Sequence, residues 1–294
     1  MAASVHVPVM LREVLQQLEL RPGLTVVDGT VGAGGHSSRI AEQIAPDGTL
    51  IGLDRDPMML AFAAERIPEG NRHLRQASYS EIRTVLQELS IDSVDRILLD
   101  LGLSSDQLAD RDRGFGYAAD APLDMRFDTR GGEPAHVLLA RLDEAKLEDI
   151  FTRYGEERFS AAIANEIVNR RRSNPVRTTA DLCDAVEAAI PAKFRRDARR
   201  EPATRVFQAL RIAANEELRH LERALSTELY DALAPGGRLA IITFHSLEDR
   251  LVKDAFKDGS RWETTTKKPV APTPAEVRVN PRSRSAKLRT AVKL

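Results

Sequence analysis

The chain of 294 residues is 42% hydrophobic and 30% charged, which is ordinary for a globular protein. Its apolar runs are only strand-sized, which excludes a membrane span, and its single cysteine, Cys183, excludes an intramolecular disulfide. The length predicts one large domain with an insertion, or two domains, and the cysteine content favours a cytoplasmic protein.

The formal net charge of −1 conceals two basic blocks. Residues 170–211 contain 11 Lys or Arg against 5 Asp or Glu, and residues 251–294 contain 11 against 4. Two basic blocks on an otherwise acidic chain suggest local contact with a polyanion. Solvated, arginine-rich helix surfaces produce the same pattern, so the charge alone does not decide between the two interpretations.

Strands and helices are predicted to alternate through the first third of the chain. Residues 9–20 have apolar positions at helical spacing. Apolar runs then predict strands, and amphipathic segments predict helices, with strands at 24–27, 49–53, 73–76 and 94–99 and helices at 35–44, from Pro57 and around 82–89. Strands that are apolar throughout and separated by helices indicate a parallel sheet covered on both faces.

A glycine-rich loop follows the first strand. Four of the seven residues 29–35 are glycine, which permits positive φ and close approach of a ligand. The next helix presents unpaired N–H groups to that loop, so the pattern predicts a nucleotide-type cofactor site. Ser37 stands where a dinucleotide fingerprint would have its third glycine.

Three predicted strands end in carboxylates: Asp28, Asp54 and Asp100. Asp54 could accept both hydroxyls of a ribose, as in sites for NAD or S-adenosylmethionine, whereas Asp56 is better placed to cap the helix at Pro57. Three such carboxylates suit either a metal ion or a cationic sulfonium cofactor. Because the sequence has no Asp/His cluster at ligand spacing, we predict no metal.

The alternation stops after residue 101. Residues 102–130 predict a long functional loop, and residues 134–210 have helical patterns interrupted at Asn174-Pro175 and Ile190-Pro191. Cys183 lies in one of these helices, where we expect a packed thiol. The predicted organisation is a sheet domain formed by residues 1–108 and 214–294, with residues 109–213 inserted as a helical domain for substrate recognition.

The sheet pattern resumes near residue 216. We predict a helix at 216–233, a turn at 234–237, a strand at 238–244, a helix near 247–256, and a closing hairpin from 261–266 and 286–292. A NAD-dependent dehydrogenase would instead show a second βαβαβ half. The turn at 234–237 also resembles the turn before the fifth strand of Rossmann-like methyltransferases, and this resemblance implies an α/β fold, a Rossmann-like class I methyltransferase sheet with an inserted all-helical domain.

An ordered set of motifs resembles the MraW/RsmH family of S-adenosylmethionine-dependent methyltransferases, which act on cytosine N4 in small-subunit (16S) ribosomal RNA. The motifs extend over nearly the whole chain, although residues 262–279 do not match clearly. They lie at 6–11, 28–37, 53–57, 98–107, 113–115, 122–126, 154–159, 203–208, 244–250 and 280–289.

The resemblance implies a site for S-adenosylmethionine. Carried over position by position, it consists of Gly34, Gly35, His36, Asp54, Tyr79, Asp100 and Gln107. The family commonly has phenylalanine at the position of Tyr79, and either ring can pack near an adenine.

The cytosine amine is a weak nucleophile, so oxygen atoms that accept its N–H groups are expected to orient it and to stabilise the positive charge that develops on nitrogen, and no strong base is required. Asp100, which serves either the cofactor or the amine, and Ser104 and Ser105 in the following loop are candidates. His245, just past the fifth strand of the sheet, is a fourth candidate, with a histidine simply packed at a strand end as the alternative. We expect the remaining histidines to be structural: His6, His73, His136 and His220.

An RNA substrate would give the basic blocks a function. The target base must be unpaired or flipped out, and arginines would hold the neighbouring phosphates. The candidates are Arg195, Arg196, Arg199, Arg200, Arg205, Arg282 and Arg284, with Lys287 and Arg289 beside them. Alternatives are methylation of a DNA base or a protein, or a non-catalytic RNA-binding assembly factor. Whether the protein is a monomer or a homodimer stays open.

Overall fold

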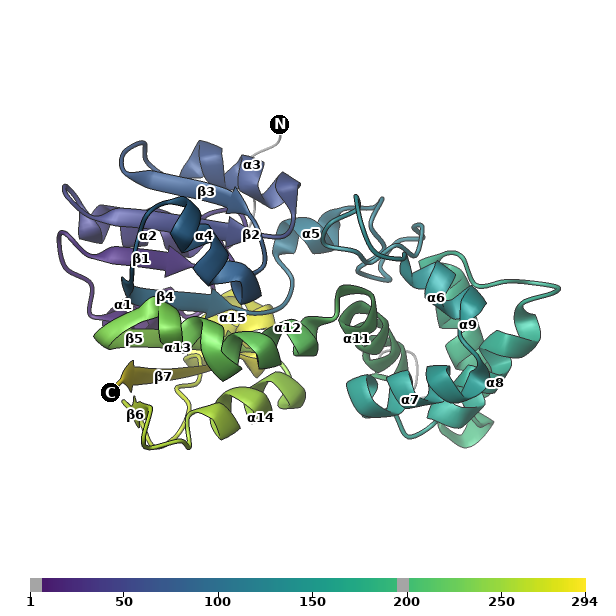
Figure 1. The fold of residues 1–294 in the computed structure, drawn as a ribbon. Helices are drawn as coiled ribbons and strands as arrows, with labels where there is room; N and C mark the ends of the chain where they lie inside the picture. Colours follow the sequence, from purple (N-terminus) through teal and green to yellow (C-terminus); the bar gives the residue numbers. More distant parts are fainter. Residues whose placement is uncertain (1–6, 195–200) are drawn as a thin grey trace. The chain divides into compact units, whose positions relative to one another are not determined.

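The computed structural model describes residues 7–194 and 201–294 and divides into two compact units (Figure 1). The first unit consists of Met1–Ser104 and Leu218–Leu294, and the second of Ser105–Glu217. The predicted insertion, residues 109–213, lies within the second unit. No helix in the described ranges combines the length and the apolar character that crossing a membrane requires.

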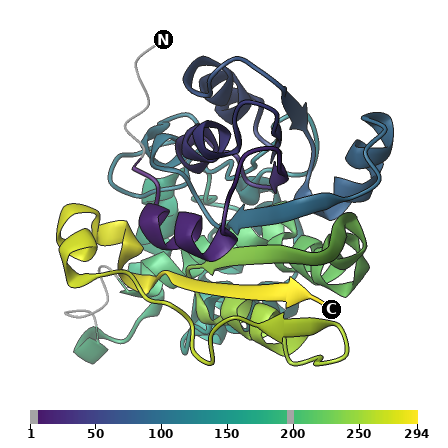
Figure 2. The same ribbon diagram turned by 90° about the vertical axis from the view of Figure 1, so that its left-hand side faces the viewer.

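The first unit contains a seven-stranded sheet in the order β3-β2-β1-β4-β5-β7-β6. Strands β1 to β5 are parallel, and β7 pairs antiparallel with both β5 and β6, as Figure 2 shows for β5 and β7. This arrangement confirms the predicted Rossmann-like α/β class. The strands are β1 Thr25–Asp28, β2 Thr49–Asp54, β3 Arg72–Gln76, β4 Val94–Asp100, β5 Leu233–Thr243, β6 Trp262–Thr264 and β7 Lys287–Lys293.

Helices cover both faces of this sheet, as the apolar strands predict. One core packs Val27, Leu99 and Ile241 against the helices after β3 and on both sides of β5 in the chain, and the other packs Val26, Leu98 and Ile242 against the first three helices. The helical segments are α1 Leu11–Leu18, α2 Gly35–Ile44, α3 Pro57–Arg66, η1 Tyr79–Glu81, α4 Ile82–Glu88, α12 Glu217–Arg223, η3 Ala224–Glu228, α13 Leu229–Ala232, α14 Ser246–Ala255, α15 Pro274–Val279 and η4 Pro281–Ser285.

Two details of the sheet differ from the prediction. The turn at residues 234–237 lies inside β5, because Leu233 already pairs with Val94 before the register shifts and Arg238 pairs with Arg96. The two final strands do pair, but they form no simple hairpin. Strand β7 lies between β5 and β6, and α15 and η4 occupy the connection.

The described part of the second unit is helical and contains no named strand, in agreement with the helical patterns. Its segments are α5 Ser105–Ala109, α6 Ala135–Arg141, α7 Glu144–Gly155, α8 Ser160–Arg170, α9 Thr179–Ala189, η2 Ala192–Phe194 and α11 Glu201–Asn215. A Cβ at Gly155 would lie 2.8 Å from the Arg205 carbonyl oxygen, so glycine lets α7 and α11 approach closely. Cys183 is partly buried in α9, and burial raises the pKa of its thiol.

Candidate functional site

Three carboxylates lie at one edge of the parallel sheet, as predicted. Strand β1 pairs with β2 on one side and β4 on the other, with Asp28 opposite Gly52 and Leu98. Asp54 and Asp100 end the two flanking strands. Parallel strands bring their carboxyl ends to the same edge, which is where open α/β sheets bind ligands.

The glycine-rich loop wraps around two of these carboxylates. Gly32, which has a φ of 51°, donates its N–H to Asp54 Oδ2 at 2.9 Å. Asp28 Oδ2 accepts the Ser37 hydroxyl at 2.7 Å. The cap of α3 is Asp56, which accepts the Met58 N–H, so Asp54 is not the cap.

Close packing explains why further loop positions are glycine. Gly34 has a φ of 79°, and a Cβ there would lie 3.0 Å from Ile67 and 3.3 Å from Ala63 of α3. A Cβ at Gly35 would lie 3.2 Å from Pro8. The loop is therefore held between α3 and the segment that precedes α1.

The aromatic candidate lies beside the start of the same loop. A Cβ at Gly29 would lie 2.9 Å from the Cβ of Tyr79, in η1. Tyr79 is flanked by Ser78 and Ser80, whose hydroxyls contact His220 Nδ1 at 3.2 and 2.7 Å. His220, expected to be structural, thus fixes the turn that carries Tyr79.

His36 joins the loop to the third carboxylate. Its Nε2 lies 2.9 Å from the Val9 carbonyl oxygen, and its Nδ1 lies 3.6 Å from Asp100 Oδ2. Asp100 Oδ1 is buried and has no hydrogen-bond partner within residues 7–194 and 201–294. A buried carboxylate oxygen without a donor is energetically costly, which leaves it available to a ligand.

Burial makes these carboxyls weak acids. Desolvation raises the pKa of Asp28 to about 6 and that of Asp54 to about 7. Desolvation also raises the pKa of Asp100 well above its usual value, and the neighbouring carboxylates of Asp28 and Glu248 raise it further. A cation bound at this edge would favour the ionised forms.

The three carboxylates fit S-adenosylmethionine. This cofactor carries two ribose hydroxyls and an amino group, which can donate hydrogen bonds to carboxylates, and a positively charged sulfonium. Asp100 Oδ1 has no hydrogen-bond partner in the part of the chain that the structure describes, and the pKa of Asp100 is raised, so a ligand that brings N–H or O–H donors and positive charge would stabilise this carboxylate. Within the described ranges, no group of three or more His, Cys, Asp or Glu side chains is arranged to hold a metal ion.

The remaining predicted catalytic and cofactor-binding residues have defined surroundings. Ser104 donates to the sulfur of Met59 at 3.2 Å. Ser105 and Gln107 lie on α5 in the second unit, and Gln107 is buried. His245 is the N-cap of α14, where its Nδ1 accepts the Glu248 N–H and its Nε2 lies 3.1 Å from Glu248 Oε1.

Sequence reasoning missed Glu248. This side chain is 3% exposed, and its Oε2 accepts the Phe244 N–H at 2.8 Å. The spacing of His245 and Glu248 is that of a capping box, which could have revealed their pairing but not the effect of Glu248 on Asp100.

The basic candidates differ in their surroundings. Arg282 and Arg284 are exposed on η4, and Arg205 is exposed on α11, 3.8 Å from buried Glu157. In contrast, Lys287 and Arg289 both pair with Asp249, at 3.0 and 2.7 Å, which balances part of their charge. Four candidates lie outside the described residues: Arg195, Arg196, Arg199 and Arg200.

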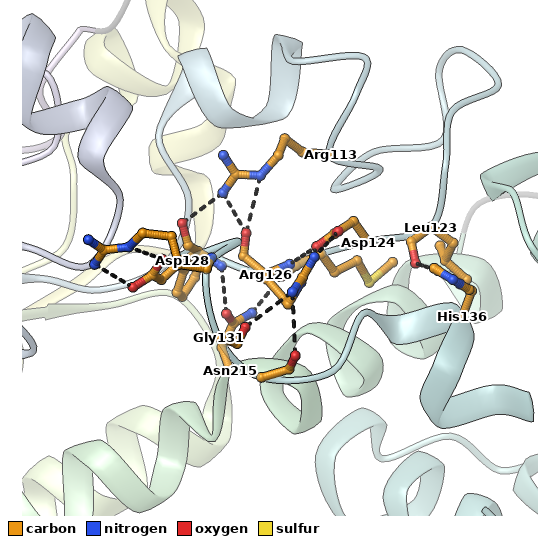
Figure 3. Close-up of polar contacts among 12 residues, drawn as sticks. Arg113, Leu123, Asp124, Arg126, Asp128, Gly131, His136 and Asn215 are labelled. Carbon is orange, nitrogen blue, oxygen red and sulfur yellow. Dashed lines mark hydrogen bonds and ion pairs between the residues drawn. The ribbon is translucent and has the colours of Figure 1, made fainter. Parts of the chain in front are cut away.

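The loop of the second unit that contains two of the family-like motifs is held by a polar network (Figure 3). Arg126 makes a bidentate pair with Asp124, at 2.8 and 2.7 Å. The Asn215 amide accepts the Phe127 N–H at 2.8 Å and donates to the Met125 carbonyl at 2.7 Å. These bonds fix buried Met125 at a φ of 64°, so the loop has a defined shape.

Comparison with known proteins agrees with the motifs. A model of the MraW methylase family matches residues 3–294. A ribosomal RNA small subunit methyltransferase H from Nitratidesulfovibrio vulgaris is 48% identical and covers 100% of this chain and 87% of that protein. Proteins of the same name from Symbiobacterium thermophilum and Rhodopirellula baltica are 45% and 46% identical, covering 98% and 99% of this chain and 96% and 92% of theirs.

Replacement of Asp100 by asparagine should stabilise the protein when no ligand is bound. A carboxyl whose pKa is raised by folding stabilises the folded state at low pH, and that contribution is lost as the pH rises through the folded pKa. Asp100→Asn should therefore have little effect on the free energy of unfolding near pH 4 and raise it by about 1–2 kcal/mol at pH 8.

Urea unfolding at both pH values measures this difference, with Asp47→Asn, at an exposed position, as the control. An Asp100→Asn effect that is equal at pH 4 and pH 8, or a destabilisation at pH 8, would contradict the assignment of Asp100 as a costly buried carboxyl.

Proposed function

Since the chain belongs to the MraW methylase family, we propose that it transfers a methyl group from S-adenosylmethionine to N4 of a cytosine in the RNA of the small ribosomal subunit. The names of the relatives support the RNA, and the motif resemblance supports cytosine N4. The observation that carries the proposal is the largely buried edge of Asp28, Asp54 and Asp100, where burial raises the pKa of all three carboxyls and Asp100 Oδ1 has no hydrogen-bond partner among the described residues.

The proposed cofactor site follows the loop and the strand ends. Asp54 would accept the ribose hydroxyls, Tyr79 would pack near the adenine, and Gly34 and Gly35 would allow close approach of the backbone. His36, Asp100 and Gln107 complete the proposed set. When bound, the cofactor supplies an electrophilic methyl group on a positively charged sulfur.

The protein's own contribution to the reaction would be positioning and proton acceptance. The lone pair of the cytosine amine is delocalised into the ring, so the amine must be held with that lone pair directed at the methyl group. Asp100 Oδ1 is the best-supported acceptor for an amine N–H, because it is buried and has no hydrogen-bond partner in the described ranges. Ser104 is a second oxygen near the end of β4. His245 contacts Glu248, and in this proposal it affects Asp100 through the Glu248 carboxylate.

The RNA must present its base outside a helical stack. We assign phosphate binding to Arg205 of the second unit and to Arg282 and Arg284 of the first, because all three are exposed. We propose the same role, from the sequence alone, for Arg195, Arg196, Arg199 and Arg200. In this proposal the helical unit recognises the substrate, and the ribosomal substrate supports a cytoplasmic location.

Asp54→Ala should weaken binding of S-adenosylmethionine about 10- to 100-fold, because two hydrogen bonds from the ribose to a carboxylate are lost. Isothermal titration calorimetry at pH 8 measures the affinity, with Asp47→Ala as the matched control. Thermal denaturation would show that the variant is folded. Unchanged affinity in a folded Asp54→Ala protein would overturn this ribose assignment.

Transfer of labelled methyl groups identifies the acceptor directly. Small subunits, free ribosomal RNA, DNA and protein would be offered separately, followed by analysis of the nucleosides. We expect the label in N4-methylcytidine from ribosomal RNA or small subunits. Label confined to DNA or protein would reject the proposed substrate, and cofactor binding with no transfer to any acceptor would favour the assembly factor.

Arg284→Glu should weaken RNA binding about five- to tenfold at low salt and reduce its salt dependence, because a phosphate contact is replaced by repulsion. Affinity for S-adenosylmethionine should not change. Arg39→Glu is a matched control, since Arg39 is an exposed arginine on α2 outside both basic blocks. Filter binding over a range of salt concentrations measures both variants, and equal behaviour of the two would remove η4 from the RNA interface.

A further inference from the structure

A carboxylate near the end of the chain holds the backbone near its beginning. Glu276 Oε1 in α15 accepts the Met10 N–H at 2.6 Å, across a separation of 266 residues. Met10 is completely buried and has a φ of 53°, a left-handed conformation that is unfavourable for a residue with a Cβ. A charge-assisted hydrogen bond from its N–H helps to maintain this conformation.

Local helix capping does not account for this contact. Thr273 caps α15 by accepting the Glu276 N–H at 3.1 Å, and a glutamate at this spacing usually returns to the N–H of the cap residue. Glu81 and Glu248 do so at η1 and α14. The Oε1 of Glu276 instead binds a distant segment, which indicates a role beyond the stability of its own short helix.

Val9, the residue before Met10, contacts His36, so the position of Met10 also affects this histidine. The Val9 carbonyl oxygen lies 2.9 Å from His36 Nε2, in a ring that is 5% exposed. A carbonyl oxygen can only accept, so Nε2 carries a proton and Nδ1 of the neutral ring does not. That Nδ1 lies 3.6 Å from Asp100 Oδ2 and therefore faces it with a lone pair.

We propose that Glu276 is a positioning residue for methyl transfer: by holding Met10 it sets the Val9 carbonyl, which fixes the proton on His36 Nε2 and directs Nδ1 at Asp100. The proton released by the methylated amine would pass to Asp100 and be shared with this nitrogen. Besides His36 on α2, the charged groups that act on Asp100 are Asp28 of β1 and Glu248 of α14. Both are carboxylates that raise the pKa of Asp100, whereas His36 places its Nδ1 3.6 Å from Asp100 Oδ2, where an unprotonated ring nitrogen can act as a base.

The role of Glu276 in methyl transfer rests on the proposed function, whereas the hydrogen bonds from Glu276 to His36 do not. Two substitutions of Glu276 therefore test the proposal by two measurements, the tautomer of His36 and the kinetics of methyl transfer. Glu276→Leu removes the acceptor, and Glu276→Gln retains an acceptor oxygen of the same reach. Asn280→Ala is the control, because Asn280 also ties the two segments together, at 3.4 Å from the Val7 carbonyl, without contacting Met10.

Nitrogen-15 NMR of histidine-labelled protein without cofactor reports the His36 tautomer. We expect the proton on Nε2 in the wild type, Glu276→Gln and Asn280→Ala, and a mixture of tautomers in Glu276→Leu. In the transfer assay, kcat of Glu276→Leu should fall about tenfold, with a smaller change in KM for S-adenosylmethionine. The acidic limb of its pH profile should move to lower pH, because an Nδ1–H facing Asp100 stabilises the carboxylate.

An unchanged His36 tautomer in folded Glu276→Leu overturns the proposal, as does failure of Glu276→Gln to restore the wild-type signals and pH profile. An equal effect of Asn280→Ala overturns it as well, because any loosening of the C-terminal segment would then suffice. If the wild type instead methylates a different acceptor, the proposed substrate fails, and the NMR comparison still decides the role of Glu276.

Discussion

The parallel register of β2, β1 and β4 is the constraint on which the rest of the site depends. Three strands that run side by side in one direction must end at one edge, and each of these strands ends in aspartate. Backbone N–H groups and the Ser37 hydroxyl satisfy Asp28 and Asp54, but Asp100 keeps an oxygen without a donor in the described ranges. The edge therefore favours a ligand that brings hydroxyls and positive charge.

The surrounding elements make this arrangement stable enough to persist. Glycines let the loop pack against α3 and the N-terminal segment, and two apolar cores cover the sheet on both faces. Proteins commonly retain costly polar groups where a ligand will bind, and they offset the cost elsewhere. The hydrogen bond from the Met10 N–H to Glu276 follows the same principle. It holds Met10 in a left-handed conformation, next to Val9, whose carbonyl oxygen contacts the His36 ring.

The sequence alone allowed prediction of the parallel sheet and its acidic edge, because strands buried on both faces and a proline at the start of α3 leave strong local patterns. Local patterns do not determine long-range pairing. The insertion of β7 between β5 and β6, the pairing of Leu233 with Val94, and the contact of Glu276 with Met10 all depend on segments far apart in the chain. The role of Glu248 was not predicted for a related reason. Its spacing from His245 is visible in the sequence, but its effect on the pKa of Asp100 depends on the packing of α14 against the sheet.

Proton release on binding S-adenosylmethionine tests most directly whether a cation completes this acidic edge. Calorimetric titrations in buffers of different ionisation enthalpy count the protons released at each pH. Because burial raises the pKa of Asp28 to about 6 and that of Asp54 to about 7, binding near pH 6.5 should release protons, and the release should decrease as the pH rises above 8. Binding that releases no protons at pH 6.5, and that has the same affinity at pH 6.5 and above pH 8, would contradict the account.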